Sequence, residues 1–329
     1  MRIKGNWILA GFLLISGPGF ATEELTPDEQ EYAETMIIYP DPEEDWLFGF
    51  HNTISDSVFG TAQWFDKFFA TDEAEEISPK ALARIRLGYE PRARNFDVFT
   101  QKFRLRLKLP HLEDKVDLLL SDDDDDGSDV NKQGGGRVAN RDKDEDTFTA
   151  ALRLINVDNI GEFVDTRIGI SGGDIFVKSR AKITYYFGTK HQLEIQPSIY
   201  YYIDDGFGSR FFTEYDYNFA EKRQFRANYS IRTSESFNGY RWRNGYHYLY
   251  QIDRYRATSL GVVINGENNG ERGFLVDNYL LNYRFRMNAY RRWLFFEIEP
   301  FVEWPEEEDY KATPGIAFRI EGYFEKKPN

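Results

Sequence analysis

The chain has no cysteine among its 329 residues, only four histidines, and no long uninterrupted apolar run. Without cysteine it forms no disulfide framework, no thiolate zinc site and no iron–sulfur cluster, and it offers no cysteine for lipid attachment. It also lacks an excess of basic residues, because 41 Lys and Arg stand against 55 Asp and Glu, for a formal net charge of −14. Nucleic-acid binding needs a net basic face, so we expect no nucleic-acid partner.

The first 21 residues have the layout of a secretory signal peptide. Arg2 and Lys4 precede an apolar run from Trp7 to Ile15, and small residues precede a cleavage site after Ala21. The alternative is a transmembrane anchor, which needs roughly 20 apolar residues and therefore a longer run than this one. We expect export across the inner membrane and cleavage after Ala21.

Charge is distributed unevenly along the rest of the chain. Residues 22–80 contain sixteen acidic and two basic residues, whereas residues 81–329 contain 37 basic and 39 acidic residues. Many acids of the second part fall in predicted turns, so the segments between the turns are basic. The sequence therefore predicts an acidic leader, residues 22–80, a basic body, residues 81–324, and a short C-terminal tail, residues 325–329.

The body alternates apolar and polar residues with the period of two that indicates strands with one apolar face. Residues 102–109, Lys-Phe-Arg-Leu-Arg-Leu-Lys-Leu, are one example. Most of the runs have about 10–13 residues, which suits strands that cross a membrane at a tilt and exceeds the 5–6 residues usual in soluble proteins. Aromatic clusters at run ends, such as residues 185–187 and 200–202, match the aromatic girdles of membrane barrels. Fourteen runs occur, near residues 81–90, 99–109, 112–121, 147–157, 162–171, 175–187, 191–203, 209–219, 222–233, 239–251, 254–265, 273–287, 292–303 and 312–324.

The predicted connections alternate in length. If the first strand rises from the periplasm, the periplasmic turns are short, as at residues 188–190. The external connections include residues 204–208, 267–272 and 305–311 and a 25-residue acidic segment after Leu120. Short periplasmic turns with longer external loops are typical of transmembrane barrels. An even strand number also returns both ends of the barrel to the periplasm.

These features resemble those of Gram-negative outer-membrane β-barrel proteins. The last run, from Thr313 through Gly315 and Phe318 to Ile320, resembles the C-terminal assembly signal of that family, although a tail follows Phe324. The resemblance implies an all-β fold, a closed antiparallel transmembrane barrel of fourteen strands (about 12–16 at the accuracy of the boundaries), with a short N-terminal helical segment. It also implies an outer-membrane location, contact with outer-membrane lipid and lipopolysaccharide, and insertion by the barrel-assembly machinery. A soluble secreted β protein is the alternative.

Apolar faces turned toward lipid place the charged residues of the body in the lumen. An Arg or Lys facing lipid at the bilayer midplane costs about 2–4 kcal/mol. The predicted lumen and solute-path residues are Arg84, Arg86, Arg104, Arg106, Lys178, Arg180, Arg226, Arg241, Arg243, Arg284 and Arg286. The predicted counter-charges are Asp165, Glu194, Glu214, Asp216, Glu297, Glu299 and Glu321. Two interpretations stay open, an ordinary salt-bridged wall and a path that prefers anions.

The acidic leader contains an aromatic and aliphatic stripe with helical spacing, at positions 54, 58, 61, 65 and 68. One hypothesis is that this segment plugs or gates the basic lumen from the periplasmic side. The alternatives are a helix lying on the surface of the inner leaflet and a docking segment for a periplasmic protein. The residues predicted to form the plug or interfacial helix are Trp46, Phe48, Ile54, Val58, Trp64, Phe65 and Phe68.

One weaker signal concerns metal binding. Asp122, Asp124 and Asp126, followed by Gly127, copy the first half of a calcium-binding loop, but Gln133 stands where that loop needs a bidentate glutamate. The hypothesis is a calcium site, and the alternative is a flexible, solvated acidic loop. We expect no other cofactor.

Catalytic motifs are missing from the sequence. No G-x-S-x-G or H-E-x-x-H motif occurs. No histidine is paired locally with a serine, the four being His51, His111, His191 and His247. We therefore expect no enzymatic activity, and rank an outer-membrane lipid-modifying enzyme below the other functions.

The sequence predicts an outer-membrane channel or passive transporter for small solutes, with anions preferred, that move along a basic lumen gated by the N-terminal segment. The alternative is a non-conducting structural or scaffold barrel whose leader binds a periplasmic protein.

Overall fold

The computed structural model describes residues 81–96, 98–108, 116–121, 148–159, 162–289 and 293–326, together with Phe65 and Phe68. Within these ranges lie fourteen strands and one short 3-10 helix, η3 (Glu306–Glu308). The strands are β1 (Ala81–Tyr89), β2 (Phe99–Lys108), β3 (Val116–Ser121), β4 (Thr149–Asn159), β5 (Glu162–Ser171), β6 (Asp174–Phe187), β7 (His191–Tyr202), β8 (Gly206–Ala220), β9 (Arg223–Ser234), β10 (Phe237–Asp253), β11 (Arg256–Asn269), β12 (Gly273–Asn288), β13 (Leu294–Pro305) and β14 (Thr313–Lys326). Each corresponds to one of the runs found in the sequence.

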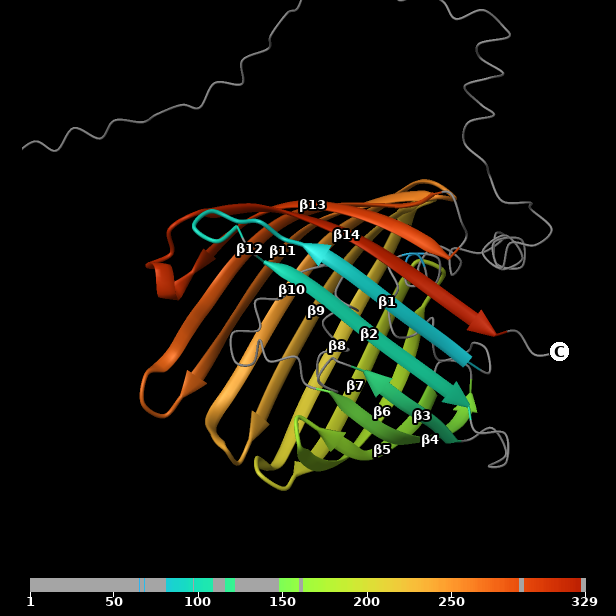
Figure 1. Cartoon of the computed structure of the whole chain (residues 1–329), viewed down its shortest axis with the longest axis vertical. Helices are drawn as coiled ribbons and strands as arrows, with labels where there is room; N and C mark the ends of the chain where they lie inside the picture. The colour runs from blue at the N-terminus through green and yellow to red at the C-terminus, as the bar shows by residue number, and fades with distance from the viewer. Residues whose placement is uncertain are drawn as a thin grey trace, which may run out of the picture. The chain divides into compact units, whose positions relative to one another are not determined.

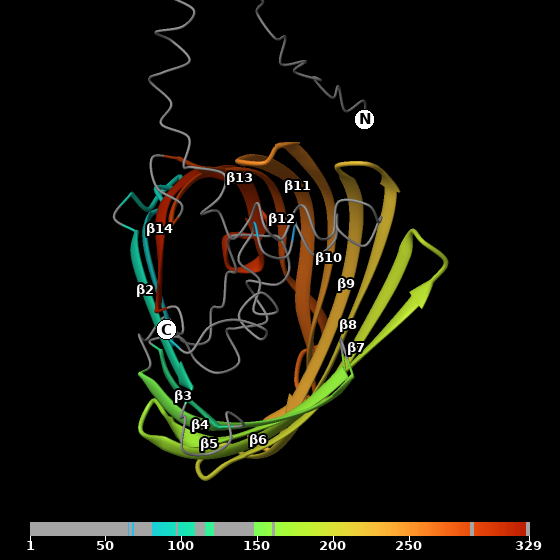
Figure 2. The same ribbon diagram turned by 90° about the vertical axis from the view of Figure 1, so that its right-hand side faces the viewer.

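The strands form one closed antiparallel barrel. Each strand pairs with its neighbours in sequence, and β14 pairs with β1 to complete the ring (Figures 1 and 2). The closing pair runs without a register shift from Ala81 opposite Lys326 to Tyr89 opposite Phe318. Closure leaves no sheet edge, so every strand can pair its backbone on both sides, as a non-aqueous solvent requires. The predicted fold class, a closed fourteen-strand antiparallel barrel, is confirmed.

Side chains alternate between an apolar outer face and a polar inner face. Ile168, Leu260 and Ile320 are about half exposed on the outside, whereas the side chains of Arg226 and Glu299 on the inside are essentially inaccessible. In strand β13 the buried and accessible positions alternate along its whole length. A soluble β-sandwich has the opposite arrangement, with its apolar residues between the sheets. The barrel is therefore inverted in the way that a lipid environment favours.

The strand ends define two rims. The terminal rim is the end at which β1 begins with Ala81 and β14 ends with Lys326, and the loop rim is the opposite end. At the loop rim, Gly172 and Gly173 join β5 to β6 with φ values of 59° and 89°. Two successive positive φ values are what a tight type I′ hairpin turn requires, and glycine adopts them without strain.

Aromatic residues gather at both rims on the outer face. At the terminal rim, Trp293 and Phe324 pack with their ring centroids 5.2 Å apart, and the exposed Phe187 ends β6. At the loop rim, Tyr89 stacks on Phe99 at 4.7 Å. Such rings favour the boundary between lipid and water.

The second half of the barrel has longer strands than the sequence predicts. Strands β8, β10 and β12 contain 15, 17 and 16 residues. Residues 206–208 and 267–269, which we expected in external loops, belong to β8 and β11. The expected contrast between short and long connections therefore fails at β7–β8 and β11–β12. These Gly- and Asn-rich segments read as loops by composition, but hairpin pairing extends them as strands beyond the apolar band.

The described residues include no helix with the length and apolar character needed to cross a membrane.

Candidate functional site

The inner wall of the barrel carries all of the basic residues predicted for the lumen. Cross-strand register confirms a shared face for members on neighbouring strands, for example Arg84 opposite Arg104. Three members, Arg104, Arg241 and Arg243, are half-buried. The other eight are buried: Arg84, Arg86, Arg106, Lys178, Arg180, Arg226, Arg284 and Arg286.

Glu321 on β14 is the centre of an ionic network across the closing strands. Its carboxylate lies 3.1 Å from Nε of Arg86 on β1 and 2.9 Å from Nη1 of Arg286 on β12. Nε of Arg84 is 3.5 Å away. One carboxylate therefore connects the first strand of the barrel to two of the last three.

Glu297 on β13 extends this network. Its carboxylate oxygens lie 2.5 Å from Nη2 of Arg284 and 2.6 Å from Nη1 of Arg319. Arg319 also pairs with Glu299 and, at 2.9 Å, with Glu90. Buried charges tolerate loss of water only when they are paired and hydrogen-bonded. We call the set the seam network; its members are Arg84, Arg86, Glu90, Arg284, Arg286, Glu297, Glu299, Arg319 and Glu321.

A second group of charges lies on β4, β5 and β6. Asp165 accepts hydrogen bonds from Arg153 at 2.6 Å and Arg180 at 2.8 Å, and Arg167 lies 3.3 Å away. The ring of Phe163 beneath them has the Arg180 guanidinium carbon 5.2 Å from its centroid. One carboxylate thus serves three buried guanidinium groups, and this part of the wall keeps a basic character.

Further pairs complete the wall on either side. Arg106 donates to Asp117 at 2.9 Å, and Arg226 donates to Asp216 at 2.8 Å. Lys182 lies 3.1 Å from Glu194. Much of the basic lumen is therefore neutralised locally, and more fully than the sequence indicates.

Several inward acids are not among the predicted counter-charges: Glu90, Asp117 and Glu303. Asp117 stands in an apolar-rich run, Val-Asp-Leu-Leu-Leu, where alternation is weak. Glu90 directly follows β1 and Glu303 lies near the end of β13, and patterns are least informative at such ends.

Four arginines near the loop rim are arranged differently. Arg210 on β8 lies directly opposite Arg232 on β9, which in turn lies opposite Arg241 on β10. Arg243 follows two residues along β10, on the same face. All four are half-buried, unlike the seam arginines. We call Arg210, Arg232, Arg241 and Arg243 the arginine row.

The neighbours of the arginine row are mostly neutral. The residues opposite its members on flanking strands are Ser198, Ser230, Asn265 and Glu267. Glu267 lies 4.0 Å from Nε of Arg241, and Ser230 accepts a hydrogen bond from Arg210 at 3.0 Å. Among the described residues directly opposite the row on flanking strands, the acidic one is Glu267.

Five wall arginines are absent from the predicted solute-path set: Arg153, Arg167, Arg210, Arg232 and Arg319. Arg319 alternates with Ala317 and Glu321 in the last strand, so the period of two was sufficient to find it. Arg210 precedes two phenylalanines, Phe211 and Phe212, of which one faces outward and the other inward. That doublet conceals the alternation.

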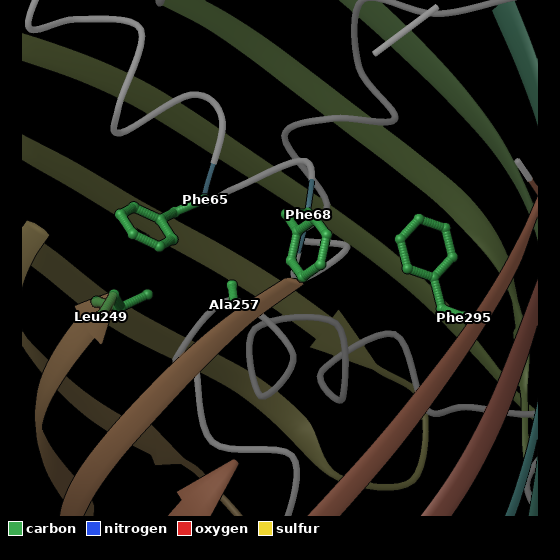
Figure 3. Packing of buried hydrophobic residues seen from close by; sticks show 5 residues of the cluster. All are labelled: Phe65, Phe68, Leu249, Ala257 and Phe295. Atoms are coloured by element: carbon green, nitrogen blue, oxygen red, sulfur yellow. The ribbon is translucent and has the colours of Figure 1, made fainter. Parts of the chain in front are cut away.

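Two residues of the leader contact the inner wall near the terminal rim. Phe65 and Phe68 are completely buried and cluster with Leu249, Ala257 and Phe295 from β10, β11 and β13 (Figure 3). The rings of Phe68 and Phe295 meet edge to face with centroids 5.8 Å apart. The other predicted plug residues, Trp46, Phe48, Ile54, Val58 and Trp64, lie outside the described residues.

This aromatic cluster adjoins the seam network. The guanidinium carbon of Arg286 lies 4.5 Å from the centroid of Phe295, and Tyr323 packs on the same cluster. Tyr323 also donates a hydrogen bond to Glu321. The wall residues that Phe65 and Phe68 contact are therefore packed against Arg286 and Tyr323, which also interact with Glu321 of the seam network.

The remaining chemical candidates are distributed as follows. The proposed calcium ligands Asp122, Asp124 and Asp126 lie outside the described residues, as do His51 and His111. Across the described ranges, no group of three or more His, Asp or Glu side chains is placed to hold a metal ion. At the terminal rim, Nδ1 of His191 lies 2.7 Å from the Tyr215 hydroxyl, and His247 is buried on the inner face opposite Arg226.

No family model and no curated protein matches the sequence. Solved structures similar to the barrel include a bacterial polysaccharide outer membrane secretin, with 10% identity and a TM-score of 0.45. A loop L8 deletion mutant of OmpT, an outer membrane protein of Vibrio cholerae, has 9% sequence identity and a TM-score of 0.47. Each of these covers 74% of this chain and 98% of the other. OprB of Pseudomonas putida has 9% sequence identity and a TM-score of 0.43, and the match covers 74% of this chain and 93% of OprB. Such low values support no inference about what this chain binds.

The architecture itself assigns the chain to a broad class. A closed antiparallel barrel with an even number of strands, an apolar outer band, aromatic girdles and a charged interior is that of Gram-negative outer-membrane proteins. The chain therefore has the fold of a transmembrane β-barrel of the outer-membrane type.

Proposed function

We propose that this barrel is an outer-membrane channel for small anionic solutes, with the leader restricting its terminal mouth. The observation that carries the proposal is the inner wall, which combines buried ion pairs with a half-exposed row of four arginines. Eight-strand barrels are filled by their own side chains, and barrels of 16–18 strands hold an aqueous channel. Fourteen strands give an intermediate interior, in which wall side chains act directly on a passing solute.

The charge of the wall supports a preference for anions. The seam network and the pairs of Arg106, Lys182 and Arg226 combine bases with acids, and the arginine row and the three arginines around Asp165 add further bases to the inner wall. A confined lumen with low-dielectric walls focuses such a field and raises the local concentration of oppositely charged solutes. Anions are therefore concentrated in this lumen, and cations are depleted from it.

Contacts of the leader support a restricting role. Burying a phenylalanine side chain contributes about 1.5–3 kcal/mol, and both Phe65 and Phe68 are buried against the wall. These two buried rings contribute to holding the leader against the wall near the terminal rim. The competing proposals for the leader are a helix on the inner leaflet and a docking segment for a periplasmic protein.

Location and partners follow from the same proposal. We propose export by the N-terminal 21 residues, insertion by the barrel-assembly machinery, and contact of the apolar band with outer-membrane lipid and lipopolysaccharide. The terminal rim would then face the periplasm, since both ends of the barrel chain lie there. The proposal includes no enzymatic step.

The dense ion pairs favour one competing function, a non-conducting scaffold barrel with a filled lumen. Planar-bilayer recordings of the purified full-length protein distinguish the two. The channel proposal expects conductance steps and a reversal potential of anion-selective sign in a KCl gradient. A protein that inserts but passes no current is a scaffold.

A test of the leader uses point variants of the two residues that touch the wall. Phe65→Ala and Phe68→Ala should increase the open fraction of the channel, because each removes part of the buried aromatic packing. Phe187→Ala is the matched control, since that ring is at the same rim but exposed on the outer face. Equal open fractions in all variants and the wild type would exclude the restricting role.

A further inference from the structure

We propose that the terminal rim binds the phosphate groups of anionic phospholipids in the surrounding membrane leaflet, through a patch of exposed bases. The patch consists of Lys190 in the β6–β7 turn, Lys222 in the β8–β9 turn and Arg223 at the start of β9. We call these three residues the rim patch. The inference goes beyond the proposed channel function and uses from it only the orientation, in which the terminal rim faces the periplasm.

Arg223 lies on the lipid-facing side of the barrel. It is exposed, the next residue, Gln224, is inaccessible, and Phe225 is exposed again. The guanidinium carbon of Arg223 lies 5.5 Å from the ring centroid of Tyr250, which stands opposite it on β10. This cation–π contact orients the planar guanidinium at the outer face. A guanidinium in that position can donate two parallel hydrogen bonds to the oxygens of a phosphate.

An aromatic band lies beside the rim patch on the outer face. The rings of His191 and Tyr217 stack with centroids 4.7 Å apart, and those of Tyr217 and Phe219 are 5.8 Å apart. Phe219 continues the band to Tyr248, with centroids 5.9 Å apart. Amphipathic rings favour the level of the lipid headgroups. Because Lys190 directly precedes His191, the rim patch stands at the depth of the headgroup phosphates.

The two rims differ in how their bases are paired. Across the described ranges, the side chains of Lys190, Lys222 and Arg223 form no ion pair. The acid between them, Glu221, is exposed as well, so three bases stand against one acid. In the described loop-rim connections, by contrast, every base pairs with an acid: Arg92 with Glu303, Arg94 with Glu308, Arg272 with Glu306 and Lys311 with Asp309. The terminal rim therefore offers bases to an anion outside the chain.

Backbone hydrogen bonds fix the two turns that carry the rim patch. The amide of Asn218 donates to the carbonyl oxygen of Lys190 at 2.8 Å, and the amide of Gln251 donates to that of Lys222 at 2.9 Å. Each turn is thus attached to the next hairpin of the barrel. Binding a lipid headgroup here requires little ordering of the backbone, which lowers the entropic cost of binding.

Charge selects the class of lipid. In a zwitterionic headgroup such as phosphatidylethanolamine, the ammonium group offsets the charge of the phosphate, whereas phosphatidylglycerol keeps a net negative charge. Lys and Arg side chains near an anionic membrane surface are each attracted to it. The excess of bases in the rim patch therefore favours anionic over zwitterionic phospholipids.

Native mass spectrometry of the full-length protein in a non-ionic detergent tests this preference, with phosphatidylglycerol and phosphatidylethanolamine in competition. The wild type should retain phosphatidylglycerol in preference. One base near an anionic surface changes affinity about fivefold, so Arg223→Gln should lower the preference by about that factor. Lys222→Gln combined with Arg223→Gln should lower it further. Arg223→Lys, which keeps the charge but not the fork of donors, should lie between Arg223→Gln and the wild type.

Arg272→Gln is the matched control, because Arg272 is an exposed arginine at the opposite rim, where it pairs with Glu306. A preference that falls in Arg223→Gln and persists in Arg272→Gln supports the site. Equal retention of both lipids by the wild type, or an equal decrease in Arg272→Gln, overturns it. A heat-modifiable gel shift selects folded variants, and Lys222→Gln replaces Arg223→Gln if that variant fails to fold.

A labelling experiment distinguishes periplasmic-leaflet phospholipid from the phosphates of lipopolysaccharide. The chain has no cysteine, so Thr189→Cys in the exposed β6–β7 turn provides a unique label site at the terminal rim. An impermeant maleimide should label it only after the outer membrane is opened. Labelling in intact cells would place the rim patch in the lipopolysaccharide leaflet and overturn the proposal. Neither measurement depends on conductance, so the lipid site and the channel are tested independently.

Discussion

In the seam network, Arg84, Arg86 and Arg286 surround one buried carboxylate, Glu321, whereas in the arginine row Arg232 stands between two further arginines. The seam side chains are almost completely inaccessible, and those of the row are half-buried. The same residue type therefore serves two purposes on one wall. In the seam network it is buried among carboxylates and connects strands, and near the loop rim it is half-buried and set beside other arginines.

The largest effect is expected at the centre of the seam network. Glu321→Gln would leave three buried arginines without their shared carboxylate, and breaking a buried ion pair from one side costs about 3–5 kcal/mol. Thermal unfolding in detergent, followed by the heat-modifiable gel shift, should show a marked loss of stability.

The control for that variant is Glu306→Gln, which removes an exposed pair with Arg272 at the loop rim. Exposed pairs contribute about 0–1 kcal/mol, so its stability should be nearly that of the wild type. Equal stability of both variants would show that the seam network does not hold the closing strands.

The next effect concerns the aromatic cluster beside the seam. Phe68→Ala should weaken the attachment of the leader by about 1.5–3 kcal/mol, the range for burying one phenylalanine. Limited proteolysis of the leader should become faster, while the barrel keeps its gel shift. If the leader of Phe68→Ala is cut at the wild-type rate, the packing of Phe68 on Phe295 does not hold it.

A smaller effect on stability, but a clear one on selectivity, is expected in the row. Arg232→Glu inserts an acid between Arg210 and Arg241, which removes a like-charge repulsion and lowers the attraction for anions. The ratio of anion to cation permeability should fall about two- to fivefold, as expected for about 0.5–1 kcal/mol. An unchanged permeability ratio would mean that the row does not influence passing ions.

The smallest effect is the response of the arginine row and of the seam network to salt concentration. Raising ionic strength from about 0.1 M to 1 M shortens the Debye length from about 10 Å to about 3 Å. Anion preference should decrease, because the row is accessible to counterions, while thermal stability should hardly change, because the seam pairs are buried. Parallel loss of selectivity and stability would contradict the distinction.

The barrel was predictable from the sequence because its physical cause is local. A period of two in side-chain polarity, repeated fourteen times, indicates one lipid face and one inner face whatever the neighbours are. The inward position of residues such as Arg180 and Arg226 follows from the same period.

Pairing across the wall was not predictable, because it depends on register between strands far apart in sequence. Arg86 and Glu321 meet only when the first strand closes on the last. The approach of Arg210 to Arg232 and Arg241 depends on the lengths of two hairpins. The polar ends of β8 and β11 were predicted as loops for a related reason, since composition alone does not reveal pairing beyond the apolar band.

Anion selectivity of the lumen is measured by the reversal potential of single channels of the full-length protein in a KCl gradient. We expect a potential of anion-selective sign that moves toward zero in Arg232→Glu. A cation-selective potential, or an insertion-competent barrel that carries no current, would contradict it.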